Sequence, residues 1–212
     1  MASEPRRARL RGLYAITPEM RDTARLVELA RQCLEGGAAL LQYRGKEAPA
    51  GLALTQARQL AALCRAHGAA FIVNDSVELA LAVQADGVHL GREDEDARHA
   101  RIVFPGGIIG VSCYADPQAA AAAAAAGADY VAIGSVFPSS TKPAAPLAPL
   151  EALGLARAAS GLPVAAIGGI TPGNAPAAIA AGADMVAVIS AIFAAPDARA
   201  AARDFARHFD PR

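Results

Sequence analysis

The sequence has no surplus of charge and no long apolar run. Lys and Arg total 20 and Asp and Glu total 20, so the formal net charge is zero. Proteins that attract nucleic acid by general electrostatics carry a basic surplus. The longest uniformly apolar run, Ala119 to Ala126, has eight residues, whereas about 20 are needed to cross a membrane. We therefore expect neither nucleic acid nor a membrane as a partner.

Cysteine is also scarce. The three residues, Cys33, Cys64 and Cys113, are widely spaced, and no Cys-x-x-Cys occurs. This pattern argues against a disulfide framework or a zinc site and predicts reduced thiols in a cytoplasmic protein. The basic N-terminus has no signal-peptide-like apolar stretch behind it. We predict a flexible tail over residues 1–11 and a single domain over 12–212.

Short apolar runs alternate with Ala- and Leu-rich stretches along the whole chain. Runs of this kind are typical of parallel strands buried on both faces. The eight predicted strands are Gly12–Ile16, Ala39–Tyr43, Ala70–Val73, Gly87–Leu90, Ile108–Val111, Tyr130–Ile133, Val164–Ile167 and Met185–Ile189. The predicted helices are Thr23–Glu35, Leu52–His67, Val77–Gln84, Pro117–Ala126, Pro149–Ser160, Pro176–Ala181 and Asp197–His208. Ser76, Asp116 and Asn174 stand where their side chains can cap helices.

A short repeat joins helices to strands. Similar turns occur at 36–38, 84–87, 127–129 and 182–184, and the last three contain Asp. Glycine in such turns ends the helix in the left-handed conformation, and the recurrence indicates one unit used repeatedly. Eight βα units in about 200 residues predict an α/β fold of one (β/α)8 TIM barrel. The alternative, a doubly wound open sheet, normally has a glycine-rich turn after its first strand, whereas this chain has Thr17-Pro18-Glu19 there.

Polar residues gather directly after the predicted strands, where barrel enzymes place their chemistry. Cations follow the second and sixth strands, as Arg44, Lys46 and Lys142, and the carboxylates Asp75 and Asp94 follow the third and fourth. Cations bind phosphate oxygens, and two carboxylates together with phosphate suit Mg²⁺. The pattern therefore predicts a metal-bound diphosphate, although ordinary surface ion pairing is the alternative.

A second anion site is predicted after the last two strands. Barrels commonly bind a phosphate there on backbone amides, and the chain has Gly168-Gly169 and Ile189-Ser190. The run from Ser139 to Thr141 offers further hydroxyls. Ser112 has no visible His-Asp partners, so we expect it to act as a hydrogen-bond donor or proton carrier. Cys113 should point elsewhere, and His89, inside an apolar strand, is interpreted as structural.

Taken in order, several motifs resemble the thiamine phosphate synthase family, over nearly the whole chain. They are Gln42-Tyr43-Arg44-Gly45-Lys46, Phe71-Ile72-Val73-Asn74-Asp75, the run from Asp86 to Asp94, Gly110-Val111-Ser112, the run from Gly134 to Lys142, Ala166-Ile167-Gly168-Gly169-Ile170 and Val188-Ile189-Ser190. The resemblance implies a transferase that joins hydroxymethylpyrimidine diphosphate to hydroxyethylthiazole phosphate. Two positions depart from the family pattern: Gly45, often Glu, and Cys113-Tyr114, where many members have a small residue and His.

The resemblance also implies roles for particular residues. Asp75 and Asp94 would bind Mg²⁺, and Ser112 and Lys142 would be catalytic. The pyrimidine diphosphate would be held by Arg44, Lys46, Asn74, Ser112 and Lys142, and the thiazole phosphate by Ser139, Thr141, Gly169, Ile189 and Ser190. The neighbouring Gln42, Tyr43, Gly45 and Ser140 complete the expected substrate site. A thiazole tautomerase, a sugar-phosphate isomerase or epimerase, and a non-catalytic phosphate-binding barrel remain alternatives, and a homo-oligomer remains open.

Overall fold

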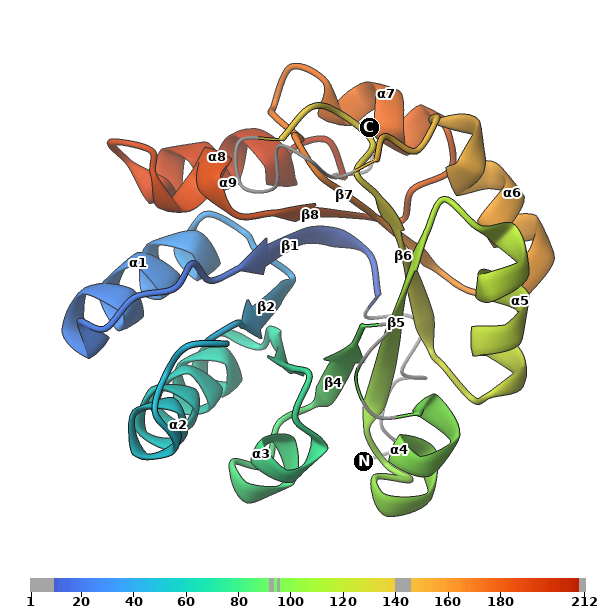
Figure 1. Ribbon diagram of the computed structural model, residues 1–212. Coiled ribbons are helices and arrows are strands. Elements are labelled where there is room, and N and C mark those ends of the chain that lie inside the picture. The colour runs from blue at the N-terminus through green and yellow to red at the C-terminus, as the bar shows by residue number, and fades with distance from the viewer. Residues whose placement is uncertain (1–9, 92–93, 95, 140–145, 210–212) are drawn as a thin grey trace.

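The computed structural model describes residues 10–91, 94, 96–139 and 146–209. Eight parallel strands pair in sequence order and close into a barrel, with helices around the outside (Figure 1). The strands are β1 Gly12–Ile16, β2 Leu40–Tyr43, β3 Ala70–Asn74, β4 Gly87–Leu90, β5 Ile108–Tyr114, β6 Tyr130–Gly134, β7 Val164–Ile167 and β8 Met185–Val188. The helices are α1 Thr23–Glu35, α2 Ala50–His67, α3 Val77–Ala82, α4 Ala97–Val103, α5 Pro117–Ala125, α6 Glu151–Ser160, α7 Ala175–Ala180, α8 Ser190–Phe193 and α9 Ala198–Ala206. The predicted (β/α)8 barrel is confirmed.

All eight predicted strands are present, but two helices were not predicted. In α4 only Ala97 and Ala100 are buried, whereas Ile102 is 75% exposed. This helix therefore lacks the apolar stripe that identifies a core-facing helix in a sequence. The other, α8, has four residues, too few to show a helical period. Strand β5 also continues beyond its predicted end, to Tyr114.

Alternating side chains on each strand build two separate apolar layers. Leu13, Phe71 and Val131 point outward and pack beneath the helices. Tyr14 and Tyr130 point inward and fill the barrel with Ile72, Met185 and other residues. A small all-parallel barrel is filled by side chains in this way rather than open as a pore. Polar groups inside it must therefore hydrogen-bond to one another or to something bound at its mouth.

The repeated turn has a definite role at the N-terminal rim, which is the end where the strands begin. The carboxylates of Asp86, Asp129 and Asp184 each accept a hydrogen bond from the first or second backbone amide of the preceding strand, at 2.9–3.0 Å. Arg101 and Arg157 also bind Asp129 and Asp184, at 2.6 and 2.7 Å. These aspartates thus tie β3 to β4, β5 to β6 and β7 to β8.

The conformation of these turns follows the glycine prediction with one exception. Gly37, Gly127 and Gly182 have φ values of 97°, 93° and 110°, which favour glycine. In the second turn Gln84 takes the corresponding place, with φ 53°. A side chain can therefore occupy this position, at the conformational cost of a left-handed non-glycine residue.

Burial begins earlier than the predicted domain boundary. Leu10 is only 1% exposed and belongs to the apolar layer inside the barrel, although residues 1–11 were predicted to form a tail. Residues 1–9 lie outside the described residues. Within the described part of the chain, no helix combines the length and the apolar character that crossing a membrane requires.

Candidate active site at the C-terminal rim

The loop after β2 is held by residues from the loop after β1. The backbone amide of Arg44 donates to Thr17 Oγ1 at 2.9 Å, and Thr17 is completely buried. The backbone amide of Lys46 donates to Glu19 Oε1 at 2.7 Å, and Arg44 Nη1 lies 3.4 Å from the same oxygen. Thr17 and Glu19 therefore fix the positions of both cations on the rim where the strands end.

Two carboxylates meet beside these cations. Asp75 directly follows β3, has a left-handed φ of 66°, and donates its backbone amide to the carbonyl of His89 at 2.8 Å. Its Oδ2 lies 2.7 Å from Lys46 Nζ. Asp94 accepts from the Gly91 amide at 2.6 Å, and its carboxyl group hydrogen-bonds that of Asp75. The predicted metal ligands are thus brought together, next to one of the predicted phosphate-binding lysines.

The proximity of the two carboxyl groups shifts their pKa values in opposite directions. Partial burial and the neighbouring Asp94 raise the pKa of Asp75, against the lowering effect of Lys46. For Asp94, burial raises the pKa, but the hydrogen bonds from Asp75 and the Gly91 amide outweigh it and lower the pKa overall. Two carboxyl groups this close share a proton unless a cation neutralises them.

Three polar residues of the predicted site, Gln42, Asn74 and Ser112, have side chains that point into the barrel. Gln42 on β2 is buried and donates from Nε2 to the Tyr14 hydroxyl at 2.6 Å. Ser112 on β5 is half-buried, and its Oγ lies 2.9 Å from His89 Nε2. Asn74 ends β3 on the same inward register, opposite His89 of β4. His89 is buried as expected for a structural residue, but it also contacts a predicted catalytic side chain.

Tyr43 does not face the barrel mouth. Its side chain packs in the outer layer, and its hydroxyl donates to Gln56 Oε1 on α2 at 2.9 Å. A Cβ added at Gly45 would overlap the Tyr43 hydroxyl. Tyr43 therefore packs beneath the loop that carries Arg44 and Lys46, which we call the cation loop. Its hydroxyl leaves no space for a side chain at position 45, and this gives a physical reason for glycine there.

The second predicted anion site lies across β7 and β8. Gly169 has φ 62°, and a Cβ there would overlap the Pro138 carbonyl oxygen. Asn174 was predicted to cap α7 but makes no cap bond, and instead donates from Nδ2 to the Gly169 carbonyl at 3.1 Å. Ser190 begins α8 and is exposed. This turn is thus packed too closely for any residue but glycine at position 169.

One rim pocket joins the two halves of the predicted site. It is lined by Pro18, Glu19, Arg44, Ile189, Ser190, Phe193 and Ala194. Arg44 was assigned to the diphosphate, and Ile189 and Ser190 to the second phosphate, so residues from both predicted subsites share this pocket. Ser140, Thr141 and Lys142 lie outside the described residues, whereas Ser139 is described and half-buried.

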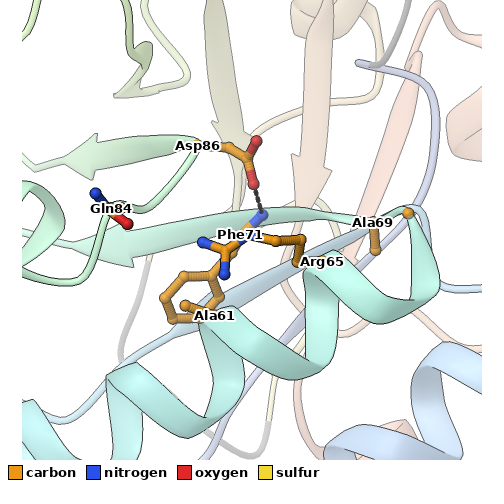
Figure 2. A pocket seen from close by; sticks show the side chains of 7 residues that line it. Ala61, Arg65, Ala69, Phe71, Gln84 and Asp86 are labelled. Atoms are coloured by element: carbon orange, nitrogen blue, oxygen red, sulfur yellow. Dashed lines mark hydrogen bonds between the residues drawn. The ribbon is translucent and has the colours of Figure 1, made fainter.

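Another pocket lies at the opposite, N-terminal rim. It is lined by Ala61, Arg65, Gly68, Ala69, Phe71, Gln84 and Asp86. Figure 2 shows the Asp86 carboxylate directed at the backbone amide of Phe71. Arg65 on α2 precedes β3 along the chain, as Arg101 on α4 precedes β5 and Arg157 on α6 precedes β7. The pocket therefore lies at the repeated Asp-containing turn that ties β3 to β4, and it contains none of the predicted site residues.

Two residues of the rim were not identified from the sequence. In the sequence, Glu19 stands out only as part of a turn without glycine. Its contacts are not visible there, because Arg44 and Lys46 lie 25 and 27 positions further along the chain. His89 was interpreted as structural, because its contact with Ser112 depends on the pairing of β4 with β5. Among the described residues no group of three or more His, Cys, Asp or Glu could hold a metal.

Comparison with known proteins agrees with the motifs. The family model described as thiamine monophosphate synthase matches residues 13–192. A thiamine-phosphate synthase from Aromatoleum aromaticum is 58% identical over 95% of this chain and 98% of its own. A thiamine-phosphate synthase from Chromobacterium violaceum is 55% identical over 96% of this chain and 99% of its own length. The solved thiamine phosphate pyrophosphorylase from Pyrococcus furiosus has a TM-score of 0.86 and 41% identity, covering 95% of this chain and 96% of that one. The chain therefore belongs to the thiamine monophosphate synthase family, a family of transferases.

Proposed function

We propose that the protein joins hydroxymethylpyrimidine diphosphate to hydroxyethylthiazole phosphate, producing thiamine phosphate and pyrophosphate. The carbon–oxygen bond between the pyrimidine methylene and the diphosphate breaks, and its electron pair leaves with pyrophosphate. The thiazole nitrogen then gives its lone pair to that carbon, forming the new carbon–nitrogen bond. The aminopyrimidine stabilises the positive charge between these events, so no protein nucleophile is needed. Charge stabilisation on the leaving group and orientation of the thiazole are what the protein must supply.

The observation that carries this proposal is the pair of facing carboxyl groups beside fixed cations. Asp75 and Asp94 hydrogen-bond each other, and Lys46 lies against Asp75. This donor set fits Mg²⁺, which prefers one or two carboxylates and completes its coordination with water and phosphate oxygens. A bound Mg²⁺ would act as a Lewis acid on the diphosphate. Asp75 and Asp94 would hold it, and Lys46 would be freed to turn toward phosphate.

The other residues would bind and orient the substrates. Arg44 and Lys46 are held by Glu19 at the mouth, where their charges would neutralise diphosphate oxygens. Asn74 and Ser112 face inward from β3 and β5, next to His89, and would contact the pyrimidine diphosphate. Lys142, which belongs to the motif after the sixth strand, would add a third cation.

The thiazole phosphate would lie across the last two strands. Gly169 and Ser190 would offer backbone amides there, because no side chain at 169 covers them. Ile189 and Ser190 share a pocket with Arg44, so this ligand would stand next to the diphosphate. Ser139 and Thr141 would supply hydroxyl groups. Such an arrangement would bring the two reacting molecules together.

The direct test is incubation with both substrates and Mg²⁺, with detection of thiamine phosphate and pyrophosphate. We expect equal amounts of the two products, and none in EDTA. Asp75→Asn should abolish most turnover, whereas the matched carboxylate-to-amide change at the other rim, Asp129→Asn, should keep the turnover of each folded molecule. Isomerisation of a thiazole without any joined product would instead identify a tautomerase.

A metal readout independent of turnover is thermal unfolding. Mg²⁺ should raise the melting temperature of the unmodified protein, since a ligand that binds only the folded state stabilises it. The rise should be absent in Asp75→Asn and retained in Asp129→Asn. An equal rise in all three proteins would contradict the assignment of the metal to Asp75.

The remaining parts of the proposal concern the chain as a whole. We propose that the chain forms one domain, which begins no later than Leu10 because this side chain lies inside the barrel. We also propose that the protein works in the cytoplasm on small-molecule substrates. Size-exclusion chromatography with light scattering would determine whether it is a homo-oligomer.

A further inference from the structure

A continuous chain of hydrogen bonds crosses the barrel interior beneath the candidate site. Gln42 Nε2 donates to the Tyr14 hydroxyl at 2.6 Å, and this hydroxyl lies 2.7 Å from that of Tyr130. The Tyr130 hydroxyl lies 2.9 Å from His89 Nδ1, and His89 Nε2 lies 2.9 Å from Ser112 Oγ. The chain therefore connects two residues expected to touch the substrate, Gln42 on β2 and Ser112 on β5.

The packing keeps this chain in one arrangement. The Tyr14 and Tyr130 rings meet edge to face, with centroids 5.9 Å apart, and His89 stacks on Tyr130 at 5.5 Å. Gly110 lies beside Tyr130 in the sheet, and a Cβ there would overlap the phenol ring. Because Gly110 has no side chain, the Tyr130 ring has space to reach both Tyr14 and His89.

The three middle members are all buried. Burial raises the pKa of both Tyr14 and Tyr130 far above its ordinary value, so both phenols stay neutral. A neutral imidazole has one donor and one acceptor nitrogen. A neutral phenol has one hydrogen to donate. The direction of each bond therefore determines the direction of the next.

Counting the hydrogens from Gln42 gives the direction of the whole chain. The Tyr14 oxygen accepts from the Gln42 amide, so its own hydrogen goes to Tyr130. The Tyr130 hydrogen then goes to His89 Nδ1. His89 must carry its proton on Nε2 and donate it to Ser112 Oγ, which leaves the hydroxyl hydrogen of Ser112 for a partner outside the chain.

We propose that His89, Tyr130 and Tyr14 are positioning residues that present the Ser112 hydroxyl to the bound pyrimidine diphosphate as a hydrogen-bond donor. This inference rests on the proposed function for the identity of that substrate. It assigns a task to three buried side chains that neither bind a phosphate nor hold the proposed metal. Inverting the Gln42 amide would reverse every bond in the chain and turn Ser112 into an acceptor from substrate.

The tautomer of His89 tests the direction without any substrate. Two-bond proton–nitrogen correlation spectra of the ¹⁵N-labelled protein at neutral pH distinguish the two ring nitrogens, and a His89→Asn sample identifies the signals. We expect a neutral ring protonated on Nε2. Tyr130→Phe should change this pattern, because Nδ1 loses its donor. A ring protonated on Nδ1, or on both nitrogens, in the unmodified protein would overturn the proposal.

Kinetics test whether the direction matters for the reaction. Tyr130→Phe should lower kcat by about tenfold, as expected for one misdirected hydrogen bond, with the KM for the thiazole phosphate unchanged. Combined with Ser112→Ala, it should cause no further loss, because both changes act through one hydroxyl. Independent, multiplying losses would show that Tyr130 does not act through Ser112.

The control is Ile72→Val, which removes one methyl group from the same apolar layer inside the barrel. It should leave kcat within about twofold. An equal loss in Ile72→Val and Tyr130→Phe would reduce the chain to ordinary packing and contradict the inference. If the unmodified protein forms no thiamine phosphate, the proposed function fails, and the His89 tautomer still decides whether the chain has the stated direction.

Discussion

Aspartates at the two rims of the barrel have opposite surroundings. At the N-terminal rim, Asp129 accepts hydrogen bonds from the Ile109 amide and from Arg101, and Asp184 is bound in the same way by Val164 and Arg157. At the C-terminal rim, the Asp75 carboxyl group faces that of Asp94. The first arrangement leaves these carboxylates with their charge compensated by protein. The second has one half-exposed lysine, Lys46, for two facing carboxyl groups, so a proton or a further cation is needed to compensate the remaining charge.

This difference indicates how the barrel separates stability from chemistry. Backbone ties at the N-terminal rim join neighbouring strands in pairs, while the C-terminal rim tolerates a left-handed Asp75 and two adjacent acids. Strained or electrostatically unfavourable groups persist where the rest of the structure holds them in place. We therefore expect substitutions at the two rims to affect different measurements.

The largest expected effect is on turnover at the C-terminal rim. Asp75→Asn keeps the size of the side chain, and Asn tolerates the left-handed conformation, but it removes the charge that a cation needs. We expect kcat to fall at least a hundredfold, the usual scale for losing one charge-stabilising group. Steady-state kinetics with both substrates measure this, and turnover within tenfold of the unmodified protein would contradict it.

The next effect is on stability at the N-terminal rim. Asp129→Ala leaves the Ile109 amide and Arg101 without their partner, so the free energy of unfolding should fall by about 2 kcal/mol. Turnover per folded molecule should be unchanged. Urea unfolding monitored by circular dichroism tests the first point, and a loss below about 0.5 kcal/mol would show that these ties contribute little.

A smaller effect is expected from Glu19, which organises the cation loop without being among the predicted ligands. Glu19→Ala removes the acceptor shared by the Lys46 amide and Arg44. The KM for the pyrimidine diphosphate should rise by about tenfold, corresponding to roughly one hydrogen bond to a charged group. The KM for the thiazole phosphate serves as the internal control, and an equal rise in both constants would point to general loosening of the rim.

The smallest expected signal comes from the cysteines, which take no part in either rim. All three are buried, and burial raises the pKa of the Cys33 and Cys113 thiols to about 12. A thiol reagent at pH 8 should label almost nothing in the native protein and three groups per chain in denaturant. Rapid labelling of one thiol in the native state would show a local opening of the fold.

Much of this arrangement follows from sequence pattern, and the missing parts have separate physical causes. Continuous apolar runs identified all eight strands, and the order of the motifs placed Asp75 and Asp94 at neighbouring strand ends. The helix α4 was missed because Ile102, its bulkiest apolar residue, faces solvent. The contact of His89 with Ser112 and Tyr130 depends on how strands are paired across the barrel. Sequence spacing alone does not contain that information.

The most direct test compares the unfolding free energies of Asp75→Asn and Asp129→Asn in urea with EDTA present. Because the pKa of Asp75 is raised in the folded state, ionising it at neutral pH disfavours folding, and this penalty disappears as the pH falls below that pKa. Asp75→Asn removes the penalty and keeps an amide that can donate to Asp94. It loses a half-exposed ion pair with Lys46, worth less than about 1 kcal/mol. The account predicts that Asp75→Asn is as stable as the unmodified protein or more so, and that Asp129→Asn is less stable. A loss of stability in Asp75→Asn equal to that in Asp129→Asn would contradict it.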